Sequence, residues 1–197
     1  MLKRIFDLCL SLCGLLILSP VFLIISVWIR LSSGPPVFFR QIRVGKEGKP
    51  FSLIKFRTMA RDPGAEKDEF EPGSSRRVTP VGRFLRKTKI DEWPQLINVM
   101  KGEMSMVGPR PEVPKWVAVY PERWKIVHRV RPGITDPASV VYRKEEELLA
   151  AAANPETAYR DEILPRKLTL YENYVVSNNL FRDFGIIIKT LFAVIKS

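Results

Sequence analysis

The longest apolar run lies near the N-terminus, where residues 8–29 carry no charged side chain. At about 22 residues, the run meets the length of roughly 20 residues that a membrane-crossing helix needs. Ser19 and Pro20 stand at its centre. Proline lacks a backbone donor and clashes with the preceding turn, so we predict a bend there, with the serine hydroxyl bonding a freed carbonyl.

Basic residues flank this run on both sides, with Lys3 and Arg4 before it and Arg30 directly after it. Because cytoplasmic segments are enriched in Lys and Arg, both ends are expected on the cytoplasmic side. A re-entrant helix-break-helix satisfies this expectation, since each arm of about 11 residues reaches roughly 17 Å, about half of the hydrocarbon core. A kinked helix that spans the membrane and a signal peptide are the open alternatives.

The pattern at the other end of the chain predicts an amphipathic helix over residues 180–195. Apolar side chains recur there at helical spacing, with Arg182, Asp183 and Lys189 between them. The helix could lie in the membrane interface or pack against the protein's own core, and the periodicity does not choose between the two.

Between the two ends, residues 37–44 and 51–58 read as two strands around a polar turn, which predicts a β-hairpin. Lys55 and Arg57 are two residues apart in the second strand and so share a face. Two cations on one face can bind a phosphate group, and the alternative is that they face lipid head groups or water. The expected fold class is α+β and predominantly helical: a monotopic membrane protein with a re-entrant hairpin over residues 1–34 and a cytoplasmic-face domain over residues 35–197.

Two further segments carry no predicted chemistry. Residues 61–75 mix acidic residues with proline and glycine and predict a surface loop. Residues 145–153, three glutamates followed by leucines and alanines, predict a solvated helix.

Composition narrows the classes of function. The 197 residues carry 32 Lys and Arg against 21 Asp and Glu, a net charge of +11, which indicates an anionic partner such as nucleic acid, acidic lipid or a phosphorylated substrate. The two cysteines, Cys9 and Cys13, lie within the apolar run, so a disulfide scaffold is excluded. His128 is the one histidine, which excludes zinc chemistry and histidine triads.

The most informative stretch is centred on Asp91 and Glu92. Apolar periodicity begins at Leu96, and Pro94 is acceptable in a helix's first turn, so the acidic pair is predicted at a helix start. There the helix dipole and nearby cations favour an ionised carboxylate, which can bind a divalent metal or attack phosphorus. The plain alternative is that Asp91 caps the helix.

Two loops add arginines held by a following proline, Arg110 before Pro111 and Arg131 before Pro132. The proline restricts each arginine to extended geometry, and rigid arginines suit phosphate oxygens. Together with Lys55, Arg57 and the acidic pair Asp91 and Glu92, these loops outline a polyphosphate site.

Six motifs then form a recognisable series. They are Lys3-Arg4-Ile5-Phe6-Asp7, Ser19-Pro20, Lys55-Phe56-Arg57-Thr58-Met59, Asp91-Glu92-Trp93-Pro94-Gln95-Leu96, Gly108-Pro109-Arg110-Pro111 and Arg131-Pro132-Gly133-Ile134-Thr135. In order and spacing, over essentially the whole chain, they resemble the bacterial sugar transferases called monotopic phosphoglycosyl transferases, in their small catalytic-core form.

The resemblance implies an enzyme that initiates glycoconjugate synthesis at the cytoplasmic face of the bacterial inner membrane. Such enzymes move a phospho-sugar from a UDP-sugar to polyprenol (undecaprenyl) phosphate and release UMP. By this resemblance Asp91 is the nucleophile of a ping-pong scheme and a Mg²⁺ ligand, and Glu92 positions or deprotonates a group in the site. The implied substrate-binding residues are Lys55, Arg57, Arg86, Arg110, Pro111 and Arg131.

The chain departs from many relatives in two places. Asp136-Pro137-Ala138-Ser139 replaces a Gly-Trp-Ala-Gln stretch, and Tyr171 stands near the position of an aspartate. We interpret Asp136 as a turn residue. The alternative function is a non-catalytic basic module that binds a membrane surface or nucleic acid, but no nucleic-acid motif is present, so no nucleic-acid partner is expected. The sequence indicates no oligomeric state.

Overall fold

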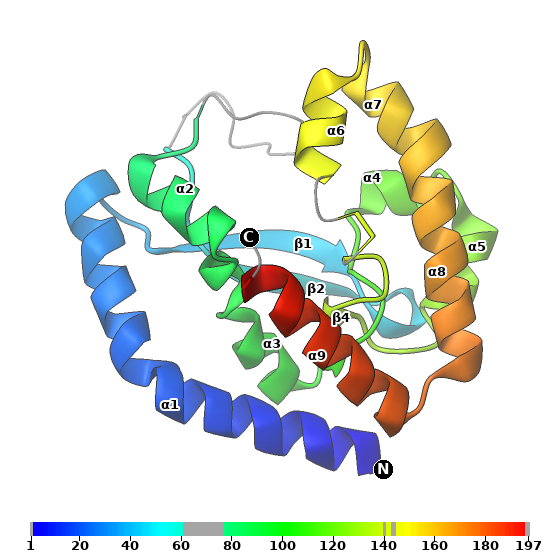
Figure 1. The fold of residues 1–197 in the computed structure, drawn as a ribbon, viewed down its shortest axis with the longest axis horizontal. Coiled ribbons are helices and arrows are strands. Elements are labelled where there is room, and N and C mark those ends of the chain that lie inside the picture. Colours follow the sequence, from blue (N-terminus) through cyan, green and yellow to red (C-terminus); the bar gives the residue numbers. More distant parts are fainter. Residues whose placement is uncertain (1, 61–76, 140, 143–144, 196–197) are drawn as a thin grey trace.

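The computed structural model describes residues 2–60, 77–139, 141–142 and 145–195, and the predicted loop over residues 61–75 lies outside them (Figure 1). The described part is predominantly helical with two small sheets, which confirms the α+β class. Its helices are α1 (Leu2–Ser33), α2 (Pro80–Lys87), α3 (Gln95–Lys101), α4 (Pro114–Val117), α5 (Pro121–Val127), α6 (Glu145–Ala151), α7 (Pro155–Ala158), α8 (Leu164–Ser177) and α9 (Leu180–Ile195). Short 3₁₀ turns are η1 (Lys46–Gly48) and η2 (Ile90–Glu92), and η3 (Tyr159–Ile163) is a π turn. The strands are β1 (Phe38–Val44), β2 (Pro50–Phe56), β3 (Ser105–Val107) and β4 (Gly133–Thr135).

Helix α1 is continuous through Pro20 and is bent along its length (Figure 1). The Ser19 hydroxyl donates to the carbonyl of Leu16 over 2.8 Å, and this carbonyl is the acceptor that Pro20, lacking an N–H, leaves free. The predicted bend therefore has its predicted cause. The predicted break is corrected to a bend within one helix, because the serine replaces the missing hydrogen bond. The re-entrant path through a membrane stays a prediction.

The start of α1 is fixed to the rest of the chain by polar side chains. Arg4 donates to the last carbonyls of α3 over 2.8 and 3.2 Å, which caps that helix's C-terminus. Asp7 is 2% exposed and accepts from the Ser105 hydroxyl and the Met106 amide of β3, each over 3.0 Å. These residues hold α1 against the elements that lead into the candidate site.

Lys3 completes this attachment in a group that we call the anchor cluster, formed by Lys3, Tyr174 and Asp183. Lys3 pairs with Oδ2 of Asp183, and the Tyr174 hydroxyl donates to Oδ1 over 2.6 Å. Lys3 also donates to the carbonyl of Val107, which lies 3.1 Å from the Tyr174 hydroxyl. The anchor cluster thus joins α1, α8 and α9 at the end of β3.

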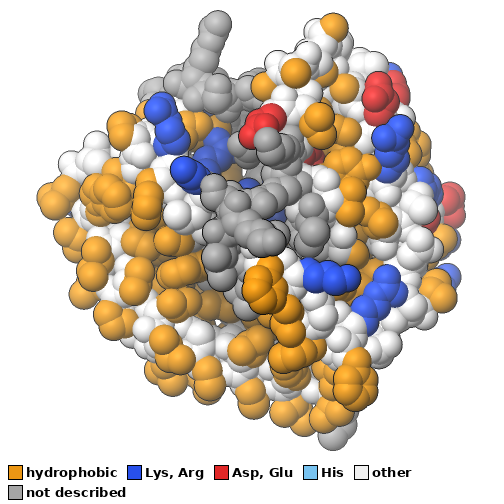
Figure 2. All heavy atoms as spheres, viewed as in Figure 1, with side chains coloured by type: hydrophobic (Ala, Val, Ile, Leu, Met, Phe, Trp, Pro, Cys, Tyr) orange, Lys and Arg blue, Asp and Glu red, His pale blue; other side chains and the backbone are white. Residues whose placement is uncertain are grey.

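Most apolar side chains of α1 and α9 point outward. In α1, Asp7, Ser11, Ile25 and Ile29 are buried while residues such as Leu16, Ile17 and Leu23 are exposed. Among the described residues α1 is the one helix whose length and composition would suit a membrane crossing. In α9, Asp183 is fully buried, whereas Phe181 is 93% and Phe192 61% exposed. Figure 2 shows hydrophobic side chains gathered where α1 and α9 run in Figure 1. The predicted C-terminal helix is confirmed, and its apolar stripe faces away from the protein.

The predicted hairpin is also confirmed: β1 and β2 pair antiparallel, with Phe38 opposite Phe56. Asn98 of α3 is fully buried and bonds to β2 twice, accepting from the Ile54 amide over 3.1 Å and donating to the Ser52 carbonyl over 2.8 Å. Because α3 directly follows η2, these two bonds set the acidic pair of η2 against the end of β2.

The remaining helices form the largest apolar core. Trp116 of α4, Trp124 of α5, and Leu164 and Leu168 of α8 are almost fully buried in one cluster. Around this cluster the apolar side chains are buried, as in the core of a soluble globular protein. The predicted solvated helix exists as α6, but its first residue, Glu145, turns inward and pairs with the buried Lys167 over 3.0 Å, which corrects the expectation of a fully solvated segment.

Candidate active site

Four predicted residues lie together, and we call them the site cluster: Lys55, Asp91, Glu92 and Arg110. They come from β2, from η2 and from the loop after β3. Lys55 Nζ lies 2.8 Å from Glu92 Oε1. Both terminal nitrogens of Arg110 donate to the same carboxylate, one to each oxygen. Glu92 is therefore held between two cations that arrive from different parts of the chain.

Asp91 does not cap a helix. It lies within η2, and α3 begins only at Gln95, where Pro94 occupies the N-cap position without a side-chain bond. The turn is started by Lys89, whose φ of 58° places a non-glycine residue in the left-handed region, a conformation that clusters at functional sites. The capping interpretation of Asp91 is wrong, because the α-helix starts too late for it.

The carboxylate of Asp91 is buried and incompletely bonded. The residue is 7% exposed, and its Oδ1 has no hydrogen-bond partner within the described part of the chain. Buried polar atoms are nearly always bonded, and an exception calls for an explanation such as a catalytic role or a bound ion. An oxygen left free in this way is available to a ligand.

The two neighbouring carboxylates have opposite pKa shifts. Burial raises the pKa of Asp91 to about 6, against the opposing effect of the Lys55 cation. The pKa of Glu92 is held well below its usual range, because the attraction of Arg110 and Lys55 outweighs the cost of its burial. The predicted helix-dipole effect on Asp91 is corrected: at this position desolvation is larger.

The cations respond to the same environment. Burial lowers the pKa of Lys55, while the Glu92 carboxylate raises that of Arg110 well above its ordinary value. Arg110 thus keeps a permanent charge beside the acidic pair. A fixed cation of this kind suits the oxygens of a phosphate.

The two Arg-Pro loops lie side by side. Strands β3 and β4 pair in parallel, with Ser105 opposite Gly133 and Val107 opposite Thr135. The backbones approach so closely that a Cβ on Gly133 would lie 2.1 Å from the nitrogen of Gly108. Only glycine fits this contact, which explains why both motifs contain one.

The other predicted substrate-binding residues make different contacts. Arg131 donates from Nε to the Gly102 carbonyl over 2.8 Å, at the end of α3. Arg57 is 7% exposed and donates to the carbonyls of Ser33 and Gly34 at the end of α1, over 2.8 and 2.6 Å. Arg86 is half-buried in the last turn of α2. Arg131 and Arg57 thus bond to backbone carbonyls at the ends of α3 and α1.

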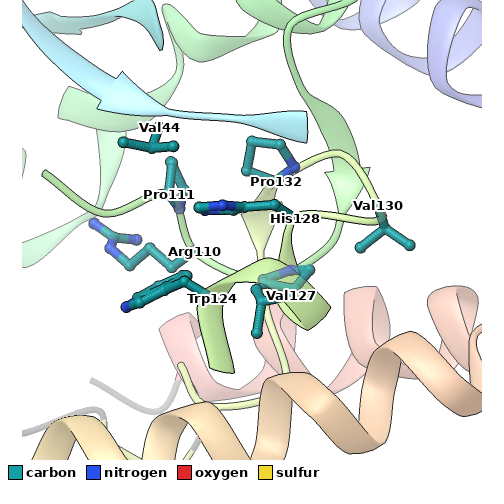
Figure 3. A pocket seen from close by; sticks show the side chains of 9 residues that line it. Val44, Arg110, Pro111, Trp124, Val127, His128, Val130 and Pro132 are labelled. Carbon is teal, nitrogen blue, oxygen red and sulfur yellow. The ribbon is translucent and has the colours of Figure 1, made fainter. Parts of the chain in front are cut away.

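Pro111 lines a small hollow behind the arginine loop (Figure 3). His128 lies there between Pro111 and Pro132, with its ring stacked on Trp124 at a centroid distance of 5.2 Å. Burial lowers the pKa of His128. The hollow is lined mainly by apolar and proline residues, so it supports the two loops rather than presenting groups for chemistry.

Within the described residues there is no group of three or more acidic, cysteine or histidine side chains that could hold a metal ion. Mg²⁺, however, usually takes one or two carboxylates and completes its shell with water and substrate phosphates. The unbonded oxygen of Asp91 fits that requirement. Asp91 is the residue that would hold the ion.

Asp136 is the turn residue that the sequence predicts. Its Oδ1 accepts from the amides of Ala138 and Ser139 over 2.8 and 2.9 Å. Tyr171, the second departure, is 1% exposed and packs near Trp124.

Arg43 and Tyr159 both bond to Glu112, behind the site. Neither residue is among those that the sequence patterns predict for the site. Arg43 has a side chain only 12% exposed, while its strand neighbour Ile42 is 53% exposed. In a strand with one face buried, the apolar residues are usually buried and the charged ones exposed, and here the two are exchanged. The one available signal was the position of Glu112 directly after the Arg110-Pro111 pair.

Comparison with known proteins identifies the family of the chain. The family model described as bacterial sugar transferase matches residues 1–197. The chain is 45% identical over 139 residues to the sugar transferase EpsL of Bacillus subtilis (strain 168), covering 71% of this chain and 68% of that protein. It is 34% identical over 193 residues to the UDP-glucose:undecaprenyl-phosphate glucose-1-phosphate transferase of Caulobacter vibrioides, covering 96% of this chain and 68% of that one.

A third relative, the UDP-N-acetylgalactosamine-undecaprenyl-phosphate N-acetylgalactosaminephosphotransferase of Aeromonas hydrophila, is 40% identical over 144 residues. The match covers 72% of this chain but only 34% of that protein. The chain belongs to the bacterial sugar transferase family, and the expected resemblance is confirmed at that level.

Proposed function

We propose that the protein transfers a phospho-sugar from a UDP-sugar to undecaprenyl phosphate and releases UMP. The observation that carries this proposal is the buried Asp91 carboxylate, with one unbonded oxygen, beside a Glu92 that is fully paired with Lys55 and Arg110. The names of the relatives from Caulobacter and Aeromonas support the two substrates. Those relatives use different sugars, so the sugar is left to experiment.

The reaction proceeds in two displacements in this proposal. First, an Asp91 carboxylate oxygen attacks the sugar-bearing phosphorus of the UDP-sugar, and the bond from that phosphorus to the bridging oxygen breaks. UMP leaves with the electron pair, and the phospho-sugar is bound to Asp91 as an acyl phosphate. A phosphate oxygen of undecaprenyl phosphate then attacks the same phosphorus, the bond to Asp91 breaks, and the carboxylate is regenerated.

The residues of the site cluster have separate roles in this scheme. Asp91 must be ionised to attack, and at neutral pH a carboxyl with a pKa of about 6 is mostly so. Glu92, with its lowered pKa and two cationic partners, is a poor base and positions Arg110 and Lys55. Those two cations face the phosphate oxygens. Mg²⁺ on Asp91 would neutralise the diphosphate's charge as two anions approach.

Membrane placement follows from the helices in the same proposal. The outward apolar faces of α1 and α9 would lie in one leaflet at the cytoplasmic face of the bacterial inner membrane, with α1 re-entering over residues 1–34 and residues 35–197 above it. The polar face of each helix contacts the rest of the protein, as in the anchor cluster, where Lys3 of α1 pairs with Asp183 of α9. A site at this boundary is accessible to a soluble nucleotide sugar and to a lipid phosphate.

The activity is tested by UMP release from a panel of UDP-sugars, with undecaprenyl phosphate and Mg²⁺, in detergent or lipid. Wild type should release UMP with at least one sugar. Incubation with that sugar alone should add one phospho-sugar mass to the peptide containing Asp91, and adding undecaprenyl phosphate should remove it. Lipid-dependent UMP release without this adduct would contradict the covalent step, and no release from folded protein would favour a non-catalytic module.

The topology is tested separately by cysteine labelling. On a background with Cys9 and Cys13 replaced by serine, single cysteines at Leu2 and Gly34 should both react with an impermeant reagent from the cytoplasmic side. Reaction from opposite sides would show a spanning helix.

A further inference from the structure

The loop that carries Arg110 is held from behind by a second polar group, formed by Arg43, Glu112 and Tyr159. The backbone of Glu112 is bonded to β1, since the Val44 amide donates to its carbonyl over 2.9 Å. Arg43 donates to the carbonyl of Pro111 over 3.1 Å. The two residues that follow Arg110 are thus fixed to the hairpin.

The Glu112 carboxylate is the centre of this group. The residue is 6% exposed. Its Oε1 accepts from Arg43 over 3.0 Å and from the Val113 amide over 2.8 Å, and its Oε2 accepts from the Tyr159 hydroxyl over 2.5 Å. Both oxygens are used in bonds within the protein, so Glu112 has no oxygen reserved for a ligand.

A buried pair of this kind is an inefficient way to stabilise a fold. Burial lowers the pKa of Arg43 even with Glu112 beside it, which shows that desolvation outweighs the attraction. Apolar residues of similar size often replace such pairs without loss of stability, and a buried ion pair has its best-supported use in specifying one geometry. The geometry specified here is that of the loop between β3 and α4.

The direction of that loop decides where Arg110 points. Arg110 is two residues before Glu112, and its guanidinium meets both oxygens of Glu92. Figure 3 shows Arg110 and Pro111 side by side at the edge of the hollow, with Val44 of β1 next to them. A shift of about 1 Å in this loop would break a two-point contact and can cost about 100-fold in rate.

We propose that Glu112 is a positioning residue for the transfer reaction: held by Arg43 and Tyr159, it fixes the loop so that Arg110 is delivered to Glu92 and to the phosphate-binding side of the site. The inference rests on the proposed function and adds Glu112, Arg43 and Tyr159 to the residues that determine its rate. Glu112 does not touch the reacting atoms, and its effect passes through Arg110.

A double-mutant cycle tests this route. Wild type, Glu112→Gln, Arg110→Ala and the double variant are compared for kcat/KM toward the active UDP-sugar, corrected for the folded fraction. Glu112→Gln should lower kcat/KM about tenfold, mainly by raising KM, and should have less than a twofold effect in the Arg110→Ala background, because coupled residues are not additive. Tyr159→Phe, which removes one bond and keeps the ring packed, should show the same pattern more weakly.

The control is Glu122→Gln, whose side chain is 86% exposed, and it should match wild type. Additive losses for Glu112→Gln and Arg110→Ala would overturn the positioning role, as would a loss of thermal stability with unchanged kcat and KM. Absence of UMP release by wild type would instead contradict the proposed function. In that case the same cycle, measured on the Kd for UDP, still decides whether Glu112 acts through Arg110.

Discussion

Two ionic clusters adjoin the same loop but differ in how completely they are bonded. In the anchor cluster, both oxygens of Asp183 accept hydrogen bonds, and Lys3 also donates to the Val107 carbonyl. In the site cluster, Glu92 is equally well paired, but Asp91 has a buried oxygen with no partner in the described chain. Complete bonding marks a structural cluster, whereas the unused oxygen of Asp91 marks a position kept for a ligand.

The difference also concerns energy. A buried carboxylate without a full set of partners costs folding free energy, on the order of 1–3 kcal/mol for an unsatisfied group. The pKa of Asp91 is raised for the same reason, because burial makes the ionised carboxylate less favourable. A protein that retains such a residue gains something other than stability from it, and replacing the aspartate of each cluster should separate stability from activity.

The largest effect is expected from Asp91→Asn. An amide cannot attack phosphorus, so UMP release should fall by at least about 10³-fold. The unfolding temperature should stay within a few degrees of wild type or rise, because no bond to Oδ1 is lost. The measurement is UMP release beside thermal unfolding in detergent, and activity above one percent of wild type would exclude Asp91 as the nucleophile.

Gly133→Ala should separate the two Arg-Pro loops. The added Cβ would lie 2.1 Å from the Gly108 nitrogen, so β3 and β4 must move apart. We expect kcat/KM to fall about 100-fold, as for other misplacements near 1 Å. Gly185→Ala is the matched control, since nothing lies within 4 Å of its added Cβ, and it should leave activity unchanged. Equal effects of the two substitutions would show that the close contact does not matter.

Asp183→Ala breaks the anchor cluster and should act on stability alone. Removing the fully buried Asp183 takes the counter-charge from Lys3 and the nearer acceptor from Tyr174, leaving the Val107 carbonyl to both, and should cost about 3 kcal/mol. Chemical denaturation in mild detergent measures this cost, while kcat per folded molecule should stay within twofold of wild type. A tenfold loss of kcat in folded protein would show that the anchor cluster also takes part in the reaction.

Local features of the sequence predicted the elements that depend on neighbouring residues. The bend at Pro20, the hairpin and the helix over residues 180–195 each follow from a proline, a turn or a period within one segment. The pairing of β3 with β4 could not be predicted in this way, because each strand has three residues and its partner lies far along the chain.

The candidate site also has features that the sequence predicted and features that it did not. Asp91, Glu92, Lys55 and Arg110 were identified as one site from their chemistry, and the structure brings them together. The direction of the Asp91 pKa shift was wrong, because nearby cations are visible in the sequence and burial is not. For Arg131, whose Nε bonds to the Gly102 carbonyl, no local pattern specifies the partner.

The pH dependence should give the sharpest distinction between a role of Asp91 in stability and a role in the reaction. The pKa of Asp91 is about 6 in the folded chain and near 3.8 when unfolded, so the folded state binds more protons between those values. Its contribution to stability is therefore full below about pH 4, declines as pH rises to 6, and is lost above it, by roughly 3 kcal/mol in all. Asp91→Asn should lack this decline.

Activity should change in the opposite direction over the same range. As Asp91 ionises, kcat/KM for the UDP-sugar should rise about tenfold per pH unit below 6 and level off above it. Lys55, Lys89, Glu92 and Arg110 are the charged groups that act on Asp91. Of the two neighbouring carboxyls only Asp91 has a pKa in this range, because the pKa of Glu92 is held well below its usual value, so a single step is expected. Thermal unfolding of wild type and Asp91→Asn from pH 4.5 to 7.5, beside the rate profile, measures both curves. A flat rate profile with the stability decline intact would mean that Asp91 titrates in the fold without being the group that attacks.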